Sequence, residues 1–147
     1  MSIILDTLRT APPPQPNPSF PNRTLLTTQP RNLLPLSPVQ YLITAIDSVA
    51  PLLKIRQQRG VAGGGASLPL PVPLGVRQRR RMAIQWILTS ADNRKEVNLA
   101  DRVAREIINV AEGKSSAWEK RAQTHKLAIS ARSNIRQMMI AGRAKRF

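Results

Sequence analysis

The sequence lacks cysteine altogether and is poor in aromatic and acidic residues. The absence of cysteine excludes disulfides and zinc sites built on thiolates. Aromatic residues make up only 3% of the chain, so any folded core has to be mostly aliphatic. No apolar run reaches the roughly 18 residues that a membrane-spanning helix needs, and residues 1–10 lack the regions of a secretory leader. We therefore expect no membrane span.

Positive charge, in contrast, is abundant and is concentrated toward the C-terminus. The chain has 23 lysine and arginine residues against 8 aspartate and glutamate residues, a net charge of +15. Residues 1–53 hold three basic and two acidic side chains, so nearly all of the excess lies in residues 54–147. Repulsion on this scale destabilises a compact monomer unless a counter-charged surface relieves it. The charge therefore predicts a polyanionic partner, above all a nucleic acid.

The N-terminal part of the chain differs in character from the rest. Residues 1–9 have the apolar pattern of the last turns of a helix, a helical remnant. Residues 10–36 contain eight prolines, which fix φ and remove amide donors, so extended backbone is expected there. A segment of this composition is usually ordered only along a partner. Residues 37–147 are left to form one helical domain.

This domain is predicted to begin with a helix and a β-hairpin. Ser37-Pro38-Val39-Gln40 combines an N-cap, a proline at the first helical position and a capping-box glutamine, and Pro51 ends the helix. Two strands follow, over 52–57 and 67–74, on either side of a glycine-rich turn. Proline alternates with aliphatic residues in the second strand, so its outer edge cannot recruit a third strand. We expect a projecting arm at about 52–74.

Three more helices are predicted after the hairpin, over 76–91, 99–112 and 116 to about 140. In the second of them, Asp101–Arg105 and Arg102–Glu106 have the i,i+4 spacing of ion pairs. Ser116 and Glu119 form a capping box at the start of the third. The predicted fold class is mainly α: a small helical bundle with one inserted β-hairpin arm.

Arginines cluster at two places near the hairpin. The helix that follows it opens with Arg77, Arg79, Arg80 and Arg81, where the helix dipole disfavours cations and the four side chains repel one another. An external phosphate would relieve both effects, and a solvated basic face is the alternative. Arg56 and Arg59 flank the glycine turn, where guanidinium groups can bind phosphates or stack on bases. The alternative there is a merely flexible tip.

Basic residues also occur along the last predicted helix and the tail after it: Lys120, Arg121, Lys126, Arg132, Arg136 and Arg143. Helix positions 121, 125, 128, 132 and 136 fall on one stripe, which predicts a basic face. Cations near a helix C-terminus are favourable in their own right, which is the alternative explanation of the tail.

Residues for catalysis or metal binding are scarce. His125 is the only histidine, and the chain has no nucleophile elbow, no paired carboxylates in a glycine-rich setting and no P-loop ending. We expect no enzymatic activity, no cofactor and no metal site. Trp86 and Trp118 lie at helical spacing with aliphatic residues, which favours core anchors over base-stacking platforms.

The order of these elements, with three short runs of sequence, resembles a known family. The runs are Ala83-Ile84-Gln85-Trp86, Val103-Ala104-Arg105-Glu106-Ile107 and Lys120-Arg121-Ala122-Gln123-Thr124-His125-Lys126-Leu127-Ala128. Residues 37–136 look like ribosomal protein seven of the small ribosomal subunit, of bacterial and organellar type. The last run is the most specific of the three.

This resemblance carries its own expectations. Members of the family bind the 3′ major domain of the small-subunit ribosomal RNA and help organise the head of the subunit. Their hairpin lies near the exit-site tRNA and the messenger RNA path, and proteins nine and eleven of the small subunit are neighbours. Carried over by position, RNA contacts are implied for Arg59, Arg80, Lys120, Arg121, His125 and Lys126. His125 then either faces the RNA or wedges the last helix against the body.

Departures from the family suggest a mitochondrial member. The family's first helix is missing ahead of Met1, and a proline-rich insertion stands where the family has a shorter connection. On this interpretation residues 37–147 are the RNA-binding domain of a structural constituent of the ribosome. The alternative is an architectural DNA-binding protein with a basic body and a β-arm. A membrane-surface protein is disfavoured by Asp101, Glu106 and Glu112 on helix faces that should be cationic.

Overall fold

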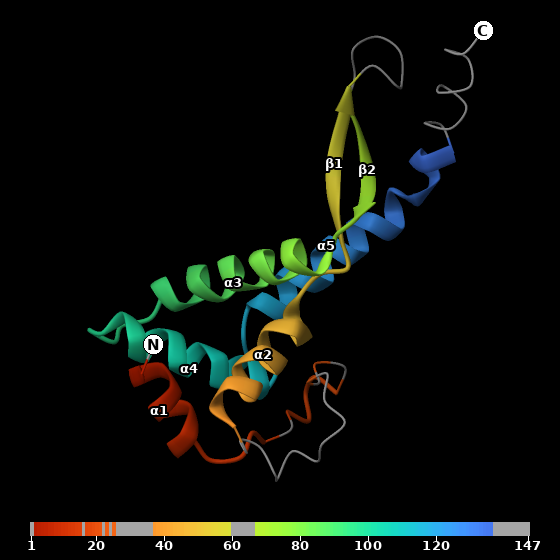
Figure 1. The fold of residues 1–147 in the computed structure, drawn as a ribbon. Helices are drawn as coiled ribbons and strands as arrows, with labels where there is room; N and C mark the ends of the chain where they lie inside the picture. The colour runs from red at the N-terminus through yellow and green to blue at the C-terminus, as the bar shows by residue number, and fades with distance from the viewer. Residues whose placement is uncertain are drawn as a thin grey trace, which may run out of the picture.

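The computed structural model describes residues 2–15, 17–21, 23, 25, 37–59 and 67–136. Along them run α1 Ser2–Thr10, α2 Pro38–Val49, β1 Leu53–Arg59, β2 Ser67–Pro73, α3 Val76–Asp92, α4 Leu99–Ala111 and α5 Ala117–Ser130 (Figure 1). The predicted fold class, mainly α with one inserted hairpin arm, is confirmed.

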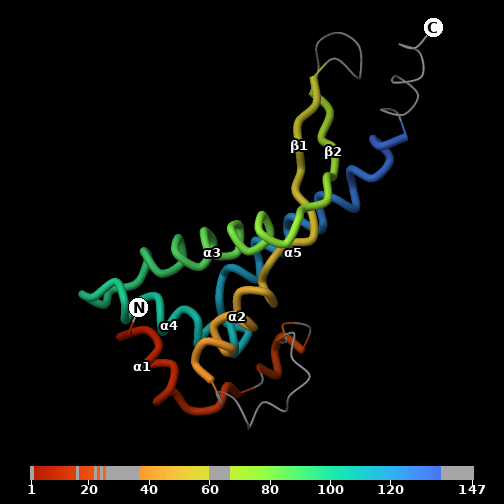
Figure 2. Tube along the Cα trace, viewed as in Figure 1, coloured from red at the N-terminus to blue at the C-terminus, as the bar shows by residue number. Residues whose placement is uncertain are grey.

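The hairpin stands apart from the helical body (Figure 1). Its strands are antiparallel, with Leu53 opposite Pro73 at the base and Arg59 opposite Ser67 at the outer end of the ladder. α3 and α5 contact each other near this base, where α5 also contacts β1. α1, α2 and α4 form the rest of the body, on the side away from the arm (Figure 2).

The core is largely aliphatic, as the scarcity of aromatic residues requires. All five of these helices contribute buried side chains to it: Leu8, Tyr41, Ala45, Val49, Ala83, Ile107, Val110 and Ala117. Trp118 is also buried, and its Nε1 donates a hydrogen bond of 2.9 Å to the carbonyl of Val110. Trp86 is half-buried and packs against the same cluster. Both tryptophans are therefore core anchors, as their spacing predicted.

Part of the proline-rich segment also lies against this core. Leu25 is buried in it, and Arg23 donates a hydrogen bond of 3.3 Å to the carbonyl of Gly113. Arg23 also lies 3.5 Å from Glu119 in an ion pair. Gly113 has a φ of 76°, and a Cβ at this position would lie 3.1 Å from the Cβ of Arg23. The expectation that this segment is ordered only along a partner is wrong for Arg23 and Leu25, because the chain's own body supplies their contacts.

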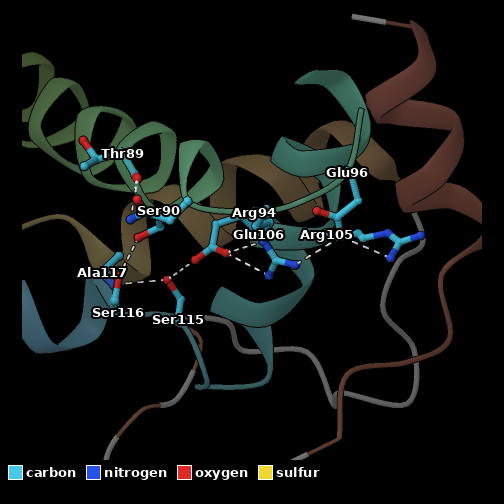
Figure 3. Close-up of polar contacts among 10 residues, drawn as sticks. Thr89, Ser90, Arg94, Glu96, Arg105, Glu106, Ser115, Ser116 and Ala117 are labelled. Atoms are coloured by element: carbon cyan, nitrogen blue, oxygen red, sulfur yellow. Dashed lines mark hydrogen bonds and ion pairs between the residues drawn. The ribbon is translucent and has the colours of Figure 1, made fainter. Parts of the chain in front are cut away.

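Neither predicted capping box forms. Ser37 and Ser116 lie at the N-caps of α2 and α5, but neither side chain makes a capping hydrogen bond. At α5 the hydroxyl of Ser115 accepts a 3.1 Å hydrogen bond from the amide of Ala117 instead. The hydroxyl of Ser116 is 2.5 Å from that of Ser90, so it bridges α5 to α3 (Figure 3). A tertiary contact thus competes with the local cap and replaces it.

The last helix is shorter than predicted. α5 ends at Ser130, and Ala131 makes a turn before residues 132–136 become helical again. The side-chain amide of Asn134 donates a hydrogen bond of 2.9 Å to the carbonyl of Pro69 in β2. This contact holds the second helical segment against the hairpin. Residues 137–140, the end of the predicted helix, lie outside the described residues.

A network of charged side chains joins α4 to the loops on either side of it (Figure 3). Glu106 is only 4% exposed, and it accepts hydrogen bonds from Arg94 at 2.9 Å and from the hydroxyl of Ser115 at 2.6 Å. Arg105 donates to Glu96 at 3.2 Å. The two i,i+4 ion pairs predicted within α4, all of whose residues the structure describes, do not form. Glu106 points inward, so its cation has to come from the loop before α4.

Replacing Glu106 by alanine should lower the free energy of unfolding by about 3 kcal/mol, because it leaves Arg94 and Ser115 without their acceptor in a buried site. Urea unfolding followed by circular dichroism measures the change. Asp101→Ala on the same helix removes only an exposed hydrogen bond with Asn98, so it should cost less than about 1 kcal/mol. Equal losses in the two variants would contradict the structural role of the network.

Tyr41, the only tyrosine, provides a second test. Its hydroxyl is buried without a hydrogen-bond partner in the part of the chain that the structure describes. Burial, and to a lesser degree Glu112, raises its pKa from 10.0 to about 12. The folded state therefore holds this proton more tightly than the unfolded state. Stability should be unaffected by Tyr41 below pH 10.0 and should fall between there and about pH 12 by roughly 3 kcal/mol.

Ultraviolet absorbance titration of the folded protein and of the protein in urea compares the two pKa values of Tyr41 directly. The folded midpoint should lie near 12 and the unfolded one near 10.0. Coincident midpoints would show that the hydroxyl is not buried in the core.

Candidate nucleic-acid interface

The first two turns of α3 carry the predicted arginine cluster. Gly75, its N-cap, has no side chain to accept a hydrogen bond, and the first turn contains no acidic residue. The backbone amides without hydrogen-bond partners at the start of this helix therefore lie in the same two turns as Arg77, Arg79, Arg80 and Arg81. Arg77, Arg80 and Arg81 are exposed, and Arg79 is partly buried. Both the amides and the guanidinium groups favour an anion at this end.

One of these arginines is held by a carboxylate of the protein itself. Nε and Nη2 of Arg80 donate to the two oxygens of Asp47 in α2, at 2.6 and 2.7 Å. The bidentate pair raises the pKa of Arg80 through its hydrogen bonds and its charge. Arg80 therefore ties α3 to α2, while Arg77, Arg79 and Arg81 form no ion pair with the described residues.

Arg79 lies close to Arg121 of α5, where the two helices meet. Arg121 is half-buried, and its Nε is buried without a hydrogen-bond partner among the described residues. Burial, followed by the charge of Arg79, lowers the pKa of Arg121. Its guanidinium also lies 5.5 Å from the ring of Trp118. Two neighbouring guanidinium groups without an acidic partner in the described chain make an unbalanced positive site.

His125 connects α5 to the base of the hairpin. Its Nε2 accepts a hydrogen bond of 3.2 Å from the backbone amide of Leu52. Burial, and then the charge of Arg121, lowers the pKa of His125. The structure thus places His125 between α5 and the base of the hairpin, and both places that the resemblance implies for this residue stay predictions.

Two cavities flank His125. One, of about 410 Å³, is lined by Ser19, Phe20, Pro21, Arg23, Trp118, Arg121, Ala122 and His125. The other, of about 600 Å³, is mostly apolar and lies between the hairpin base and the end of α5, lined by Leu52, Leu53, Pro71, Pro73, His125, Ala128, Ile129, Arg132 and Ile135. The stripe at positions 121, 125, 128 and 132 thus faces these cavities. Within this stripe Ala128 is buried next to the hairpin base, Arg121 and His125 are half-buried, and Arg132 and Arg136 are exposed, so the basic face stays a prediction.

The remaining residues that the sequence predicted to bind RNA are dispersed over the surface around Arg121 and His125. Arg56 and Arg59 are exposed on β1, and three positions apart on a strand they point to opposite faces. Lys126, Arg132 and Arg136 are exposed, and Lys120 is partly buried. Arg143 and the glycine turn at 60–65 lie outside the described residues.

The sequence analysis missed two residues, Phe20 and Arg23, which line a cavity together with Arg121 and His125. The guanidinium of Arg23 lies 3.7 Å from the centroid of the Phe20 ring, in a stacked cation–π contact. An aromatic residue and an arginine three positions apart, within a segment otherwise rich in proline, were the available signal.

No three histidine or acidic residues in the described ranges come close enough together to hold a metal ion. No helix among those ranges has the length and apolar character to cross a membrane.

Comparison with known proteins agrees with this architecture. A family model described as ribosomal protein S7p/S5e matches residues 26–132. Small ribosomal subunit protein uS7m of Neurospora crassa is 45% identical over 152 aligned residues, covering 100% of this chain and 48% of that protein. Small ribosomal subunit protein uS7 of Francisella philomiragia is 38% identical over 61% of this chain and 55% of its own length. The protein of the same name from Agrobacterium fabrum is 35% identical over 65% of this chain and 60% of its own length.

These matches define the class as structural proteins of the small ribosomal subunit. The chain belongs to the ribosomal protein S7p/S5e family and is a mitochondrial member of it. It spans about half the length of the curated relatives that it matches. The resemblance and the mitochondrial location predicted from the sequence are confirmed.

The lone imidazole of His125 can be followed by NMR without overlap. We expect a pKa below 6.5, with the proton on Nδ1 at neutral pH because Nε2 accepts from Leu52. Since the folded-state pKa is depressed, the contribution of His125 to stability is present above pH 6.5 and is lost as the pH falls through the folded-state value. Arg121→Gln should raise this pKa, because it removes the neighbouring cation. The control Lys126→Gln should leave it unchanged, and an equal shift in both variants would contradict the arrangement.

Proposed function

We propose that this chain binds the 3′ major domain of the small-subunit ribosomal RNA and helps organise the head of the subunit. The observation that carries the proposal is the unbalanced positive site where α3 meets α5. Arg79 and Arg121 lie together there, with no carboxylate of the described residues paired to either, and Arg77 and Arg81 are exposed beside them. A folded RNA supplies the phosphates that this arrangement needs.

The mechanism is phosphate neutralisation combined with recognition of RNA shape. Several acidic residues in the described part of the chain are paired internally: Asp47 with Arg80, Glu106 with Arg94, Glu112 with Lys114 and Glu119 with Arg23. The cations left without such partners are therefore available to the RNA backbone. Because side chains cannot read bases in the deep, narrow major groove of A-form RNA, contacts with phosphates select a folded shape rather than a sequence.

The hairpin is proposed to lie near the exit-site tRNA and the messenger RNA path, with small-subunit proteins nine and eleven as neighbours. The resemblance is the source of this proposal. It is supported by the projection of β1 and β2 from the body and by the exposure of Arg56 and Arg59 on the arm. No observation favours the alternative, an architectural DNA-binding protein whose arm enters the minor groove.

The test is the binding of the full chain to a transcript of the 3′ major domain, measured by filter retention over a range of salt concentrations. The double variant Arg77→Gln/Arg81→Gln should bind more weakly, and the slope of log affinity against log salt should fall by about two units. Both side chains are exposed, so the helical content should not change.

The matched control, Arg9→Gln/Lys95→Gln, removes two exposed charges from α1 and from the loop before α4. It should retain the wild-type slope. Equal slopes for all three proteins would exclude the start of α3 from the interface. Duplex DNA that displaces the transcript as effectively as structured RNA at the same salt would favour the DNA-binding alternative.

A further inference from the structure

The cavity of about 410 Å³ beside His125 has an unusual wall. One side comes from α5, through Trp118, Arg121 and His125, and the other from the proline-rich segment, through Phe20 and Arg23. Two arginines and two aromatic rings thus surround it, and its lining contains no carboxylate. Its volume lies within the range of pockets that hold small organic molecules, roughly 300–1,000 Å³.

The cation on the α5 side lacks a counter-charge. Arg121 is half-buried beside Arg79, and its Nε has no hydrogen-bond partner among the described residues. A buried guanidinium donor without an acceptor is costly, and water at the mouth of the cavity compensates for only part of its charge. An anionic oxygen placed in the cavity, which Arg121 lines, would balance this charge.

The aromatic ring on the opposite side is held in place. Arg23 stacks on Phe20 at 3.7 Å and is itself anchored to the carbonyl of Gly113 and to Glu119. The fixed arginine therefore keeps the Phe20 ring at the cavity, where 44% of its surface stays exposed. Stacking of a flat aromatic group on the Phe20 ring would be favourable. Because the ring is already ordered, such stacking costs little further conformational entropy.

From this arrangement we infer that the cavity binds one unpaired nucleotide of RNA, with its phosphate on Arg121 and its base against Phe20. Unstacked bases are commonly held on aromatic rings and guanidinium planes, and the phosphate supplies the anionic oxygen that Arg121 lacks. An acidic peptide would satisfy Arg121 but would leave the aromatic wall unused. The inference rests on the proposed function and adds a contact supplied by the proline-rich segment, outside the helices and the hairpin.

The experiment compares binding of the full chain to two labelled probes, a single-stranded uridine decamer and an RNA duplex of ten base pairs. Phe20→Ala should weaken binding of the decamer about tenfold, because stacking on one aromatic ring is lost, and should change duplex binding less than about twofold. Arg121→Gln should weaken binding of the decamer to a similar extent. Val97→Ala and Lys95→Gln, an apolar and a charge control on exposed residues of the loop before α4, should bind as the wild type does.

A second measurement locates the contact. A decamer that contains one 4-thiouridine should cross-link to the peptides around Phe20 and Trp118, and the cross-link should be lost in Phe20→Ala. Circular dichroism of each variant confirms that the fold is retained, which is expected because Phe20 is outside the core cluster.

The outcomes separate the inference from the proposed function. If the wild type binds both probes and Phe20→Ala binds the decamer as the controls do, the nucleotide site is wrong and the RNA-binding function stands. An aspartate decamer that displaces the uridine decamer equally well would also overturn it, since the cavity would then take any anion. If the wild type binds neither probe nor the 3′ major domain transcript, both proposals fail.

Discussion

Glu106 is a carboxylate almost completely withdrawn from water, and the arrangement of the C-terminal helices depends on how it is neutralised. Arg94, from the loop between α3 and α4, and Ser115, from the loop between α4 and α5, both donate to it. Because a buried charge is tolerated only when it is paired and hydrogen-bonded, the two loops are held to one point of α4. This fixes how α3 and α5 approach each other, and the pair of Arg79 and Arg121 results from that approach.

The distribution of charge follows from the small number of acidic residues. The chain has only 8 acidic residues against 23 basic ones, and some of these acids join elements: Asp47 joins α2 to α3, and Glu119 joins α5 to the proline-rich segment. Near the meeting point of α3 and α5, Arg79 and Arg121 form no ion pair with an acidic residue in the described part of the chain. The ion pairs that join these elements therefore use cations other than Arg79 and Arg121.

The proline-rich segment is where the sequence was least informative. Composition predicts extended backbone there, and a lone chain of that kind has too little apolar surface to fold. Composition does not reveal that Gly113, ninety positions after Arg23, turns with a positive φ and brings its backbone against that arginine. The resulting contact places Phe20 beside α5 and forms a wall of the cavity.

The helices, the hairpin, the tryptophan anchors and the overall basic character were determined by the sequence alone, because each depends on local spacing, on proline and glycine positions or on composition. The three short sequence runs were also sufficient to place the chain in its family. Only the tertiary structure decided the partners of Glu106, Arg105 and Arg80, the failure of the capping boxes and the burial of Ala128 within the stripe on α5. In each of these cases a local interaction is replaced by an interaction with a segment that is distant in the sequence. The spacing of residues along the sequence predicts only the local interaction.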